Sequence, residues 1–217
     1  MAGPERKILI AGCGPGAADH VTPAVRQAVK RAEVLVGAAR LLELVPGSRA
    51  VRVPVTRDVG AALEAIGQWR VRKRVVVLVS GDPGLCSLAR PIIRRFGAGV
   101  CEVLPGVSSV QVAFARVGLD WLGVRFVDAH GRTPNVDEAE LAAAEKIAVL
   151  AGTPKALRWT ARLAQRLRPA RRVVVCEDLT LPGERVRDVP AAELARLPAS
   201  SRTIILLLPA GRGSRTT

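Results

Sequence analysis

The sequence predicts an α/β fold in two domains, and three observations support this. Apolar runs typical of strands alternate with helical segments along the 217-residue chain. Three runs in the first half end in glycine-containing turns, at residues 12–16, 80–84 and 105–109. After residues 118–123 the pattern changes to include a strand–turn–strand arrangement. We therefore expect a mostly parallel sheet in 1–118, a mixed sheet in 119–217, and a ligand site in a cleft between the two domains.

Strands and helices alternate strictly in the first half. Thr22 and Pro23 form a cap-plus-N1 pair that opens a helix ending near Arg31, and Pro46-Gly47 stops a later helical segment. Crossover helices make parallel pairing the economical topology. The expected strands are 7–11, 34–36, 50–53, 75–79 and 100–104, and the expected helices are 23–31, 39–45, 59–69, 88–96 and 108–117.

In the second half, the turn Leu181-Pro182-Gly183 separates two extended segments and so implies some antiparallel pairing. We expect the tail 211–217 to be frayed. The expected strands are 125–129, 147–150, 172–176, 184–189 and 203–208, and the expected helices are 137–145, 154–167 and a short 191–197.

Composition limits the class of protein. Hydrophobic residues make up 49% of the chain, aromatic residues are scarce and tyrosine is absent, so the core is built from Val, Leu, Ile and Ala. The N-terminal apolar run is too short for a signal peptide or a membrane span. The cysteines lack a C-x-x-C pair, which favours small buried hydrophobes over a metal site: Cys13, Cys86, Cys101 and Cys176. We expect a soluble protein of the reducing cytoplasm.

The formal charge of +14 comes mostly from arginine. It indicates either an anionic partner or an arginine-rich solvated surface, and the even spread of arginine favours the surface. The tightest group, Arg158, Arg162 and Arg166, shares one face of a helix that either meets solvent or binds carboxylates. A basic nucleic-acid-binding module is an alternative class, weakened by the scarce aromatic residues and the lack of a basic tail.

The first glycine turn resembles a dinucleotide-binding loop only superficially. Such a loop runs directly into a helix that holds the pyrophosphate, whereas the helix here begins only at Pro23. The acidic ribose anchor after the second strand is also missing, because Gly37-Ala38 occupies that place.

The order G-x-G-P-G, S-G-D-P and L-P-G-V-S-S resembles the tetrapyrrole (corrin/porphyrin) methylase superfamily, which uses S-adenosylmethionine. The blocks 107–119, 130–132, 176–179 and 182–185 narrow the resemblance to the family that methylates C5 of precorrin-6Y or cobalt-precorrin-7 in cobalamin biosynthesis. The resemblance covers nearly the whole chain, and its central block is specific. It implies two α/β domains with the cofactor between them, and a homodimer.

The resemblance also implies which residues bind the cofactor and the substrate. Several of the cofactor contacts are expected from backbone atoms, so side-chain identity there is weakly constrained. The expected cofactor-binding residues are Pro15, Ser80, Gly81, Asp82, Leu85, Ser108, Ser109, Ala151, Gly152 and Leu179, and the expected substrate-binding residues are Gly14, Gly16, His130 and Arg132.

Methyl transfer from a sulfonium needs little from side chains, so we expect catalysis by positioning, with no nucleophilic residue and no metal. Asp82 is the candidate catalytic carboxylate, although it also suits a turn-forming residue before Pro83. His130 either meets a substrate carboxylate or anchors its own loop. Arginines around the cleft are expected to bind the many carboxylates of a corrinoid.

The sequence departs from the resemblance in three places. Gly37-Ala38 stands where superfamily members acting on uroporphyrinogen carry an aspartate. Many relatives follow S-G-D-P with an aromatic residue and a glycine, whereas this chain has Gly84-Leu85-Cys86-Ser87. Asp120 stands where similar proteins often have a proline. Alternatives within enzymes are another corrinoid position, or an rRNA or diphthine-precursor substrate. We expect C5 methylation alone, with C15 methylation and decarboxylation carried out by a separate protein.

Overall fold

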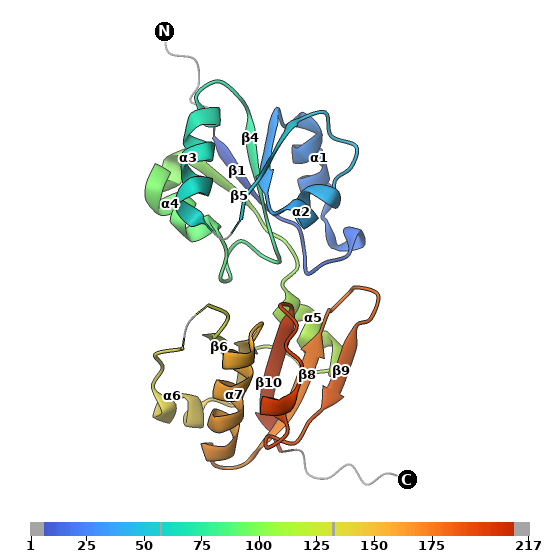
Figure 1. The fold of residues 1–217 in the computed structure, drawn as a ribbon, viewed down its shortest axis with the longest axis vertical. Helices are drawn as coiled ribbons and strands as arrows, with labels where there is room; N and C mark the ends of the chain where they lie inside the picture. Colours follow the sequence, from blue (N-terminus) through green and yellow to red (C-terminus); the bar gives the residue numbers. More distant parts are fainter. Residues whose placement is uncertain (1–6, 57, 132, 211–217) are drawn as a thin grey trace. The chain divides into compact units, whose positions relative to one another are not determined.

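The computed structural model describes residues 7–56, 58–131 and 133–210, and the chain divides into two compact units, 1–108 and 109–217 (Figure 1). The division precedes the expected boundary at Gly118. The reason is α5 (Ser109–Arg116), which buries Val110, Ala113 and Phe114 and packs against a strand of the second unit, β10 (Thr203–Pro209). The expected tail 211–217 lies outside the described residues.

Unit 1 contains a fully parallel five-stranded sheet in the order β3-β2-β4-β1-β5. Its strands are β1 (Ile8–Gly12), β2 (Val34–Gly37), β3 (Val51–Pro54), β4 (Val75–Val79) and β5 (Cys101–Leu104). Its helices are α1 (Pro23–Arg31), α2 (Ala39–Glu43), α3 (Val59–Arg70) and α4 (Ala89–Phe96), with 3₁₀ turns at Ala18–His20 and Ala98–Val100.

Strand alternation explains how both faces of this sheet are covered (Figure 1). Val77 of β4 belongs to a buried cluster with Ile66 of α3 and Ile92 of α4. Its neighbour Val76 points to the other face, into the cluster that contains Val25 of α1. Because the strands are parallel, the loops that follow β1, β4 and β5 emerge at one edge, as the glycine turns predicted.

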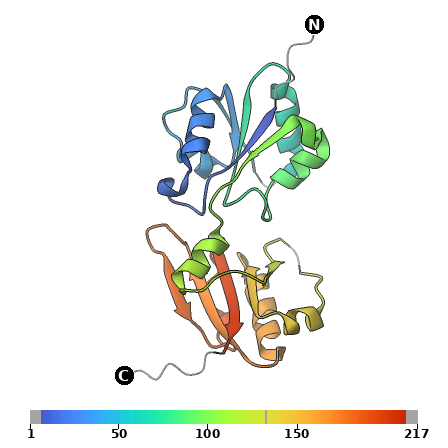
Figure 2. The same ribbon diagram turned by 180° about the vertical axis from the view of Figure 1, so that it is seen from behind.

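Unit 2 contains a mixed sheet in the order β6-β7-β10-β8-β9, in which only the β6–β7 pair is parallel. The predicted antiparallel pairing is confirmed. Figure 2 shows α5 on the face of the sheet away from α7. The remaining elements are β6 (Val124–Asp128), α6 (Glu138–Ala143), β7 (Lys146–Leu150), α7 (Pro154–Arg166), β8 (Arg171–Glu177), β9 (Arg185–Asp188) and a 3₁₀ turn at Leu194–Arg196, which is shorter than the helix expected there.

The cysteines follow the expected pattern only in part. Cys13 and Cys176 are buried and Cys101 is half-buried, but Cys86 is exposed, in a turn with φ 47°. The expectation of a buried Cys86 is wrong because the segment after β4 forms a surface turn before α4 begins. Within the described residues, no helix combines the length and apolar character that crossing a membrane requires.

Candidate active site

The carboxyl edge of the unit 1 sheet brings the predicted glycine loops together. Gly14 and Gly81 form an antiparallel bridge, with Gly81 N–H donating to the Gly14 carbonyl at 2.8 Å and Gly14 N–H donating back at 3.3 Å. Gly14 has φ 77° and Gly81 has φ 62°, conformations that favour glycine. The loops after β1 and β4 are therefore joined through their backbones.

The loop after β5 packs equally closely against the other two. A Cβ atom on Gly106 would lie 2.5 Å from the Gly81 carbonyl oxygen and 2.6 Å from that of Gly12. Asp82 fixes this contact, because Oδ2 accepts the Gly106 N–H at 3.1 Å while Oδ1 accepts the Gly84 N–H at 2.7 Å. Both carboxylate oxygens of the candidate catalytic residue thus hold backbone in place.

An arginine that the sequence analysis did not identify lies at this edge. Arg40, in the first turn of α2, donates a hydrogen bond to the Ser80 hydroxyl. Burial raises the pKa of the nearby Cys13 thiol to about 11, although the Arg40 charge acts in the opposite direction. Cys13 is therefore a neutral thiol at physiological pH and not a nucleophile. No local motif marks Arg40, because its partner Ser80 lies far along the chain.

The first loop holds a second residue that the sequence analysis did not identify. Among the described residues, His20 is one whose buried ring nitrogen, Nδ1, has no hydrogen-bond partner. His20 lies against Gly14, since a Cβ on Gly14 would come within 2.8 Å of the His20 Cβ.

Pro15 and Gly16 are buried in the same loop. In the loop after β4, the Leu85 N–H donates to the Asp82 carbonyl at 3.2 Å.

In unit 2, the predicted residues gather at one edge of the mixed sheet. His130 follows β6 and Gly152 follows β7, and the two are so close that a Cβ on Gly152 would lie 2.3 Å from the His130 Cε1. Ala151 N–H donates to the Thr203 carbonyl at 2.9 Å, which joins this corner to β10. The His130 side chain is exposed, and Arg132 lies outside the described residues.

Leu179 lies at the same edge, in the loop that follows β8. In the sheet, β10 lies between β7 and β8, and its first residue, Thr203, pairs with Glu177 at the end of β8. The loop after β8 and Ala151, which follows β7, therefore lie on opposite sides of the start of β10.

Burial, with the charges of Glu184 and Glu177, raises the pKa of the Cys176 thiol to about 12. The thiol of Cys176, like that of Cys13, is neutral and unreactive.

A groove of about 450 Å³ lies elsewhere on unit 1, lined by residues of α1, β1, β4 and β5. Leu9, Val76 and Leu104 form its floor, and Arg31 and Arg74 are among the charged residues around it. The lining extends to Leu104, the last residue of β5, but it contains none of the predicted site residues. The candidate site is therefore the loop edge and not this groove.

The two edges offer backbone groups, a carboxylate engaged with backbone, and neutral thiols. Groups of these kinds can bind and orient a ligand, and none of them is an activated nucleophile. The family model for tetrapyrrole (corrin/porphyrin) methylases matches residues 7–195, and the chain belongs to this family.

The chain is also similar to individual named proteins. The chain is 31% identical over 186 residues to a cobalt-precorrin-7 C(5)-methyltransferase of Salmonella typhimurium, covering 85% of this chain and 91% of that protein. It is 26% identical to a probable enzyme of the same name from Methanocaldococcus jannaschii, covering 91% and 95%. The crystal structure of a precorrin-6Y methylase of cobalamin biosynthesis from Archaeoglobus fulgidus is similar at TM-score 0.71 and 29% identity, covering 93% and 97%.

Proposed function

We propose that the protein is an S-adenosylmethionine-dependent C-methyltransferase of cobalamin biosynthesis that methylates C5 of cobalt-precorrin-7. The observation that carries the proposal is the extent of the Salmonella match, which spans nearly all of a relative named for this reaction. A match to a cobalt-factor III methyltransferase from Priestia megaterium is 29% identical but covers only 52% of this chain. Coverage therefore favours C5 over other corrinoid positions.

The residues present fit an adenosyl-sulfonium cofactor. The loops after β1, β4 and β5 present backbone groups at one edge, and Ser80 adds an exposed hydroxyl. The orphaned His20 Nδ1 beside Gly14 is a buried polar atom of the kind that a bound ligand or water satisfies. Pro15, Ser80, Gly81, Leu85 and Ser108 would hold the cofactor from unit 1. Ser109, Ala151, Gly152 and Leu179 are the other residues that the sequence resemblance assigns to the cofactor.

Catalysis then rests on positioning. When bound, S-adenosylmethionine would supply a sulfonium methyl to the electron-rich C5 carbon; the electron pair of the methyl–sulfur bond would stay on sulfur, and the methylated corrinoid would release one proton to water. Asp82 keeps the three glycine loops in register through its bonds to Gly84 and Gly106. Holding two reactants in a near-attack geometry can lower the barrier by about 7–11 kcal/mol. Gly14, Gly16, His130 and Arg132 are the proposed substrate contacts.

The direct test is to incubate the purified protein with S-adenosylmethionine and cobalt-precorrin-7 and to follow the corrinoid by mass spectrometry. We expect the gain of one methyl group, located at C5 by NMR. A methyl at another carbon, or no methyl while S-adenosylhomocysteine still binds, would contradict the C5 assignment. Binding to nucleic acid with steep salt dependence and no affinity for S-adenosylhomocysteine would favour the nucleic-acid alternative.

We also propose that the enzyme acts in the cytoplasm as a homodimer, as the sequence resemblance implies. Size-exclusion chromatography with light scattering would then give twice the mass of one chain. A monomer at micromolar concentration would contradict this.

A further inference from the structure

The loop between β8 and β9 contains two residues in an unusual backbone conformation. Asp178 has φ 50° and Thr180 has φ 70°, and they flank Leu179, which is only 3% exposed. A positive φ is uncommon for any residue other than glycine, and for a β-branched residue such as Thr180 it is an outlier. Residues held in this way mark segments whose shape the rest of the protein imposes.

An ion pair between the loop and α5 holds Thr180 in this conformation. The Thr180 N–H donates to Glu184 Oε2 at 2.6 Å, and Arg116 of α5 donates to both carboxylate oxygens of Glu184, at 3.2 Å for Nη2 to Oε2. Glu184 is only 23% exposed, and the pair raises the pKa of Arg116. Glu184 thus links the strained backbone directly to α5.

Asp178 is fixed in a similar way. Its Oδ1 accepts hydrogen bonds from Arg202 Nε at 2.8 Å and from the Ser200 hydroxyl at 3.4 Å. Within the loop, Leu181 N–H donates to the Asp178 carbonyl at 2.9 Å. Each strained residue is therefore tied by an arginine–carboxylate pair, and Leu179 lies between the two attachments.

We propose that the Arg116–Glu184 pair is a positioning device for the cofactor site: it holds Thr180 at positive φ and thereby sets Leu179 against the cofactor. This rests on the proposed function, since it takes Leu179 as a cofactor contact. The pair also connects α5, which begins with the proposed contact Ser109, to the loop that carries Leu179. Arg116 and Glu184 are thus proposed as positioning residues and not as catalytic ones.

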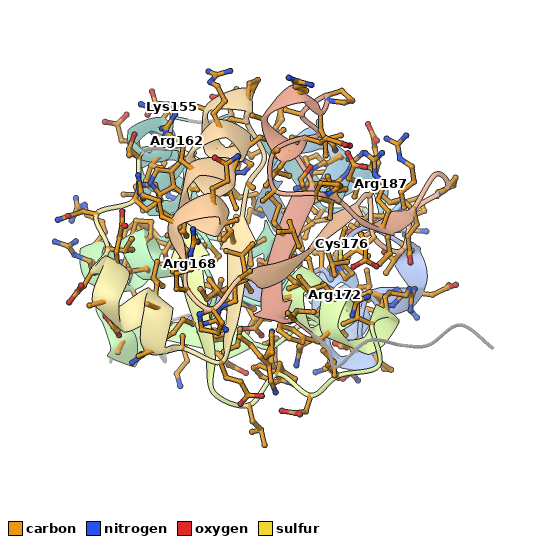
Figure 3. All side chains as sticks on the ribbon, turned by 90° about the horizontal axis from the view of Figure 1, so that it is seen from below. Lys155, Arg162, Arg168, Arg172, Cys176 and Arg187 are labelled. Carbon is orange, nitrogen blue, oxygen red and sulfur yellow. The ribbon has the colours of Figure 1, made fainter. Side chains whose placement is uncertain are left out.

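The test compares Glu184→Gln with a matched control in the same hairpin. Arg172 donates to both carboxylate oxygens of Asp188, at 2.6 and 3.0 Å, so Asp188→Asn removes the charge of a similar pair that has no bond to the 178–184 loop. Cys176 and Arg172, on β8, and Arg187, on β9, mark this hairpin in Figure 3. We expect Glu184→Gln to weaken S-adenosylhomocysteine binding about tenfold, measured by calorimetry. We expect Asp188→Asn to leave binding within about twofold of the wild type.

A second variant separates positioning from general stability. Glycine adopts positive φ without strain, so Thr180→Gly added to Glu184→Gln should restore most of the lost affinity. In turnover, Glu184→Gln should raise KM for S-adenosylmethionine with little change in kcat. Wild-type affinity in Glu184→Gln, or no recovery in the double variant, would overturn the proposal. Wild-type protein that binds S-adenosylhomocysteine but methylates a carbon other than C5 would instead count against the proposed function and leave this inference standing.

Discussion

At the residue scale, Asp82 illustrates how one side chain can organise a site without performing chemistry. Its carboxylate accepts one N–H from its own turn and one from the loop after β5. Asparagine has one acceptor oxygen and would turn its amide group toward the remaining N–H. We therefore expect Asp82→Asn to lower the free energy of unfolding by about 1–2 kcal/mol and to weaken S-adenosylhomocysteine binding in parallel. Urea unfolding and calorimetry measure both, and a loss of kcat with unchanged binding would instead support the catalytic role.

Gly106 tests the close approach of the three loops. A Cβ at this position meets two backbone carbonyls, and backbone cannot move aside as a flexible side chain can. We expect Gly106→Ala to destabilise the protein by about 3 kcal/mol and to abolish cofactor binding. Gly99→Ala is the control, because a Cβ there has no neighbour within 4 Å. Equal stability of the two variants in urea unfolding would show that the loops relax easily.

At the element scale, the sequence predicted which segments form strands and helices, because the spacing of apolar residues and the presence of helix-capping residues are local properties. Thr22, for example, caps α1 as expected by accepting the Val25 N–H at 3.3 Å. The sequence did not predict that α5 belongs to unit 2, since this assignment depends on the packing of α5 against β10. The Arg116–Glu184 and Arg40–Ser80 contacts were missed for the same reason. Each joins residues that only the fold brings together.

One such contact explains the departure at Asp120. Its carboxylate binds Lys146 Nζ at 2.7 Å, and the Lys146 side chain, at the start of β7, is only 7% exposed. The hydrogen bond from Lys146, followed by the Leu122 N–H, lowers the pKa of Asp120 below its usual 3.8. An aspartate here thus gives a buried lysine its counter-charge.

This pair predicts an acid-dependent loss of stability. Because the folded pKa of Asp120 lies below the unfolded value, its stabilisation is fully present above pH 3.8 and is lost as pH falls through the lowered folded value. Urea unfolding of wild type and Asp120→Asn from about pH 6 to about pH 2.5 should show a stability difference that shrinks at the acid end. A constant difference across this range would mean that the Asp120 charge contributes nothing to folding.

At the scale of the whole molecule, the chain has a net charge of +14, and its arginines differ in whether they bind other groups of the protein. Many arginines serve the fold: Arg52 and Arg171 donate to backbone carbonyls near the ends of α2 and α6. Others form ion pairs, among them Arg116–Glu184, Arg166–Glu138, Arg172–Asp188, Arg187–Glu177 and Arg202–Asp178. Arg166 is therefore paired, whereas Lys155, Arg158 and Arg162 share the exposed face of α7, where Figure 3 labels Lys155 and Arg162.

The excess positive charge gives the two ligands different salt dependence. A corrinoid with many carboxylates is attracted by the positive field of the protein, whereas S-adenosylhomocysteine carries no net charge at neutral pH. Raising NaCl from about 50 mM to about 500 mM should therefore raise KM for cobalt-precorrin-7 several-fold, with less than about a twofold change in the S-adenosylhomocysteine Kd. Steady-state kinetics and calorimetry at matched salt measure the two quantities. If both changed equally, salt would be acting on the fold, and the arginine-rich surface would have no part in binding the substrate.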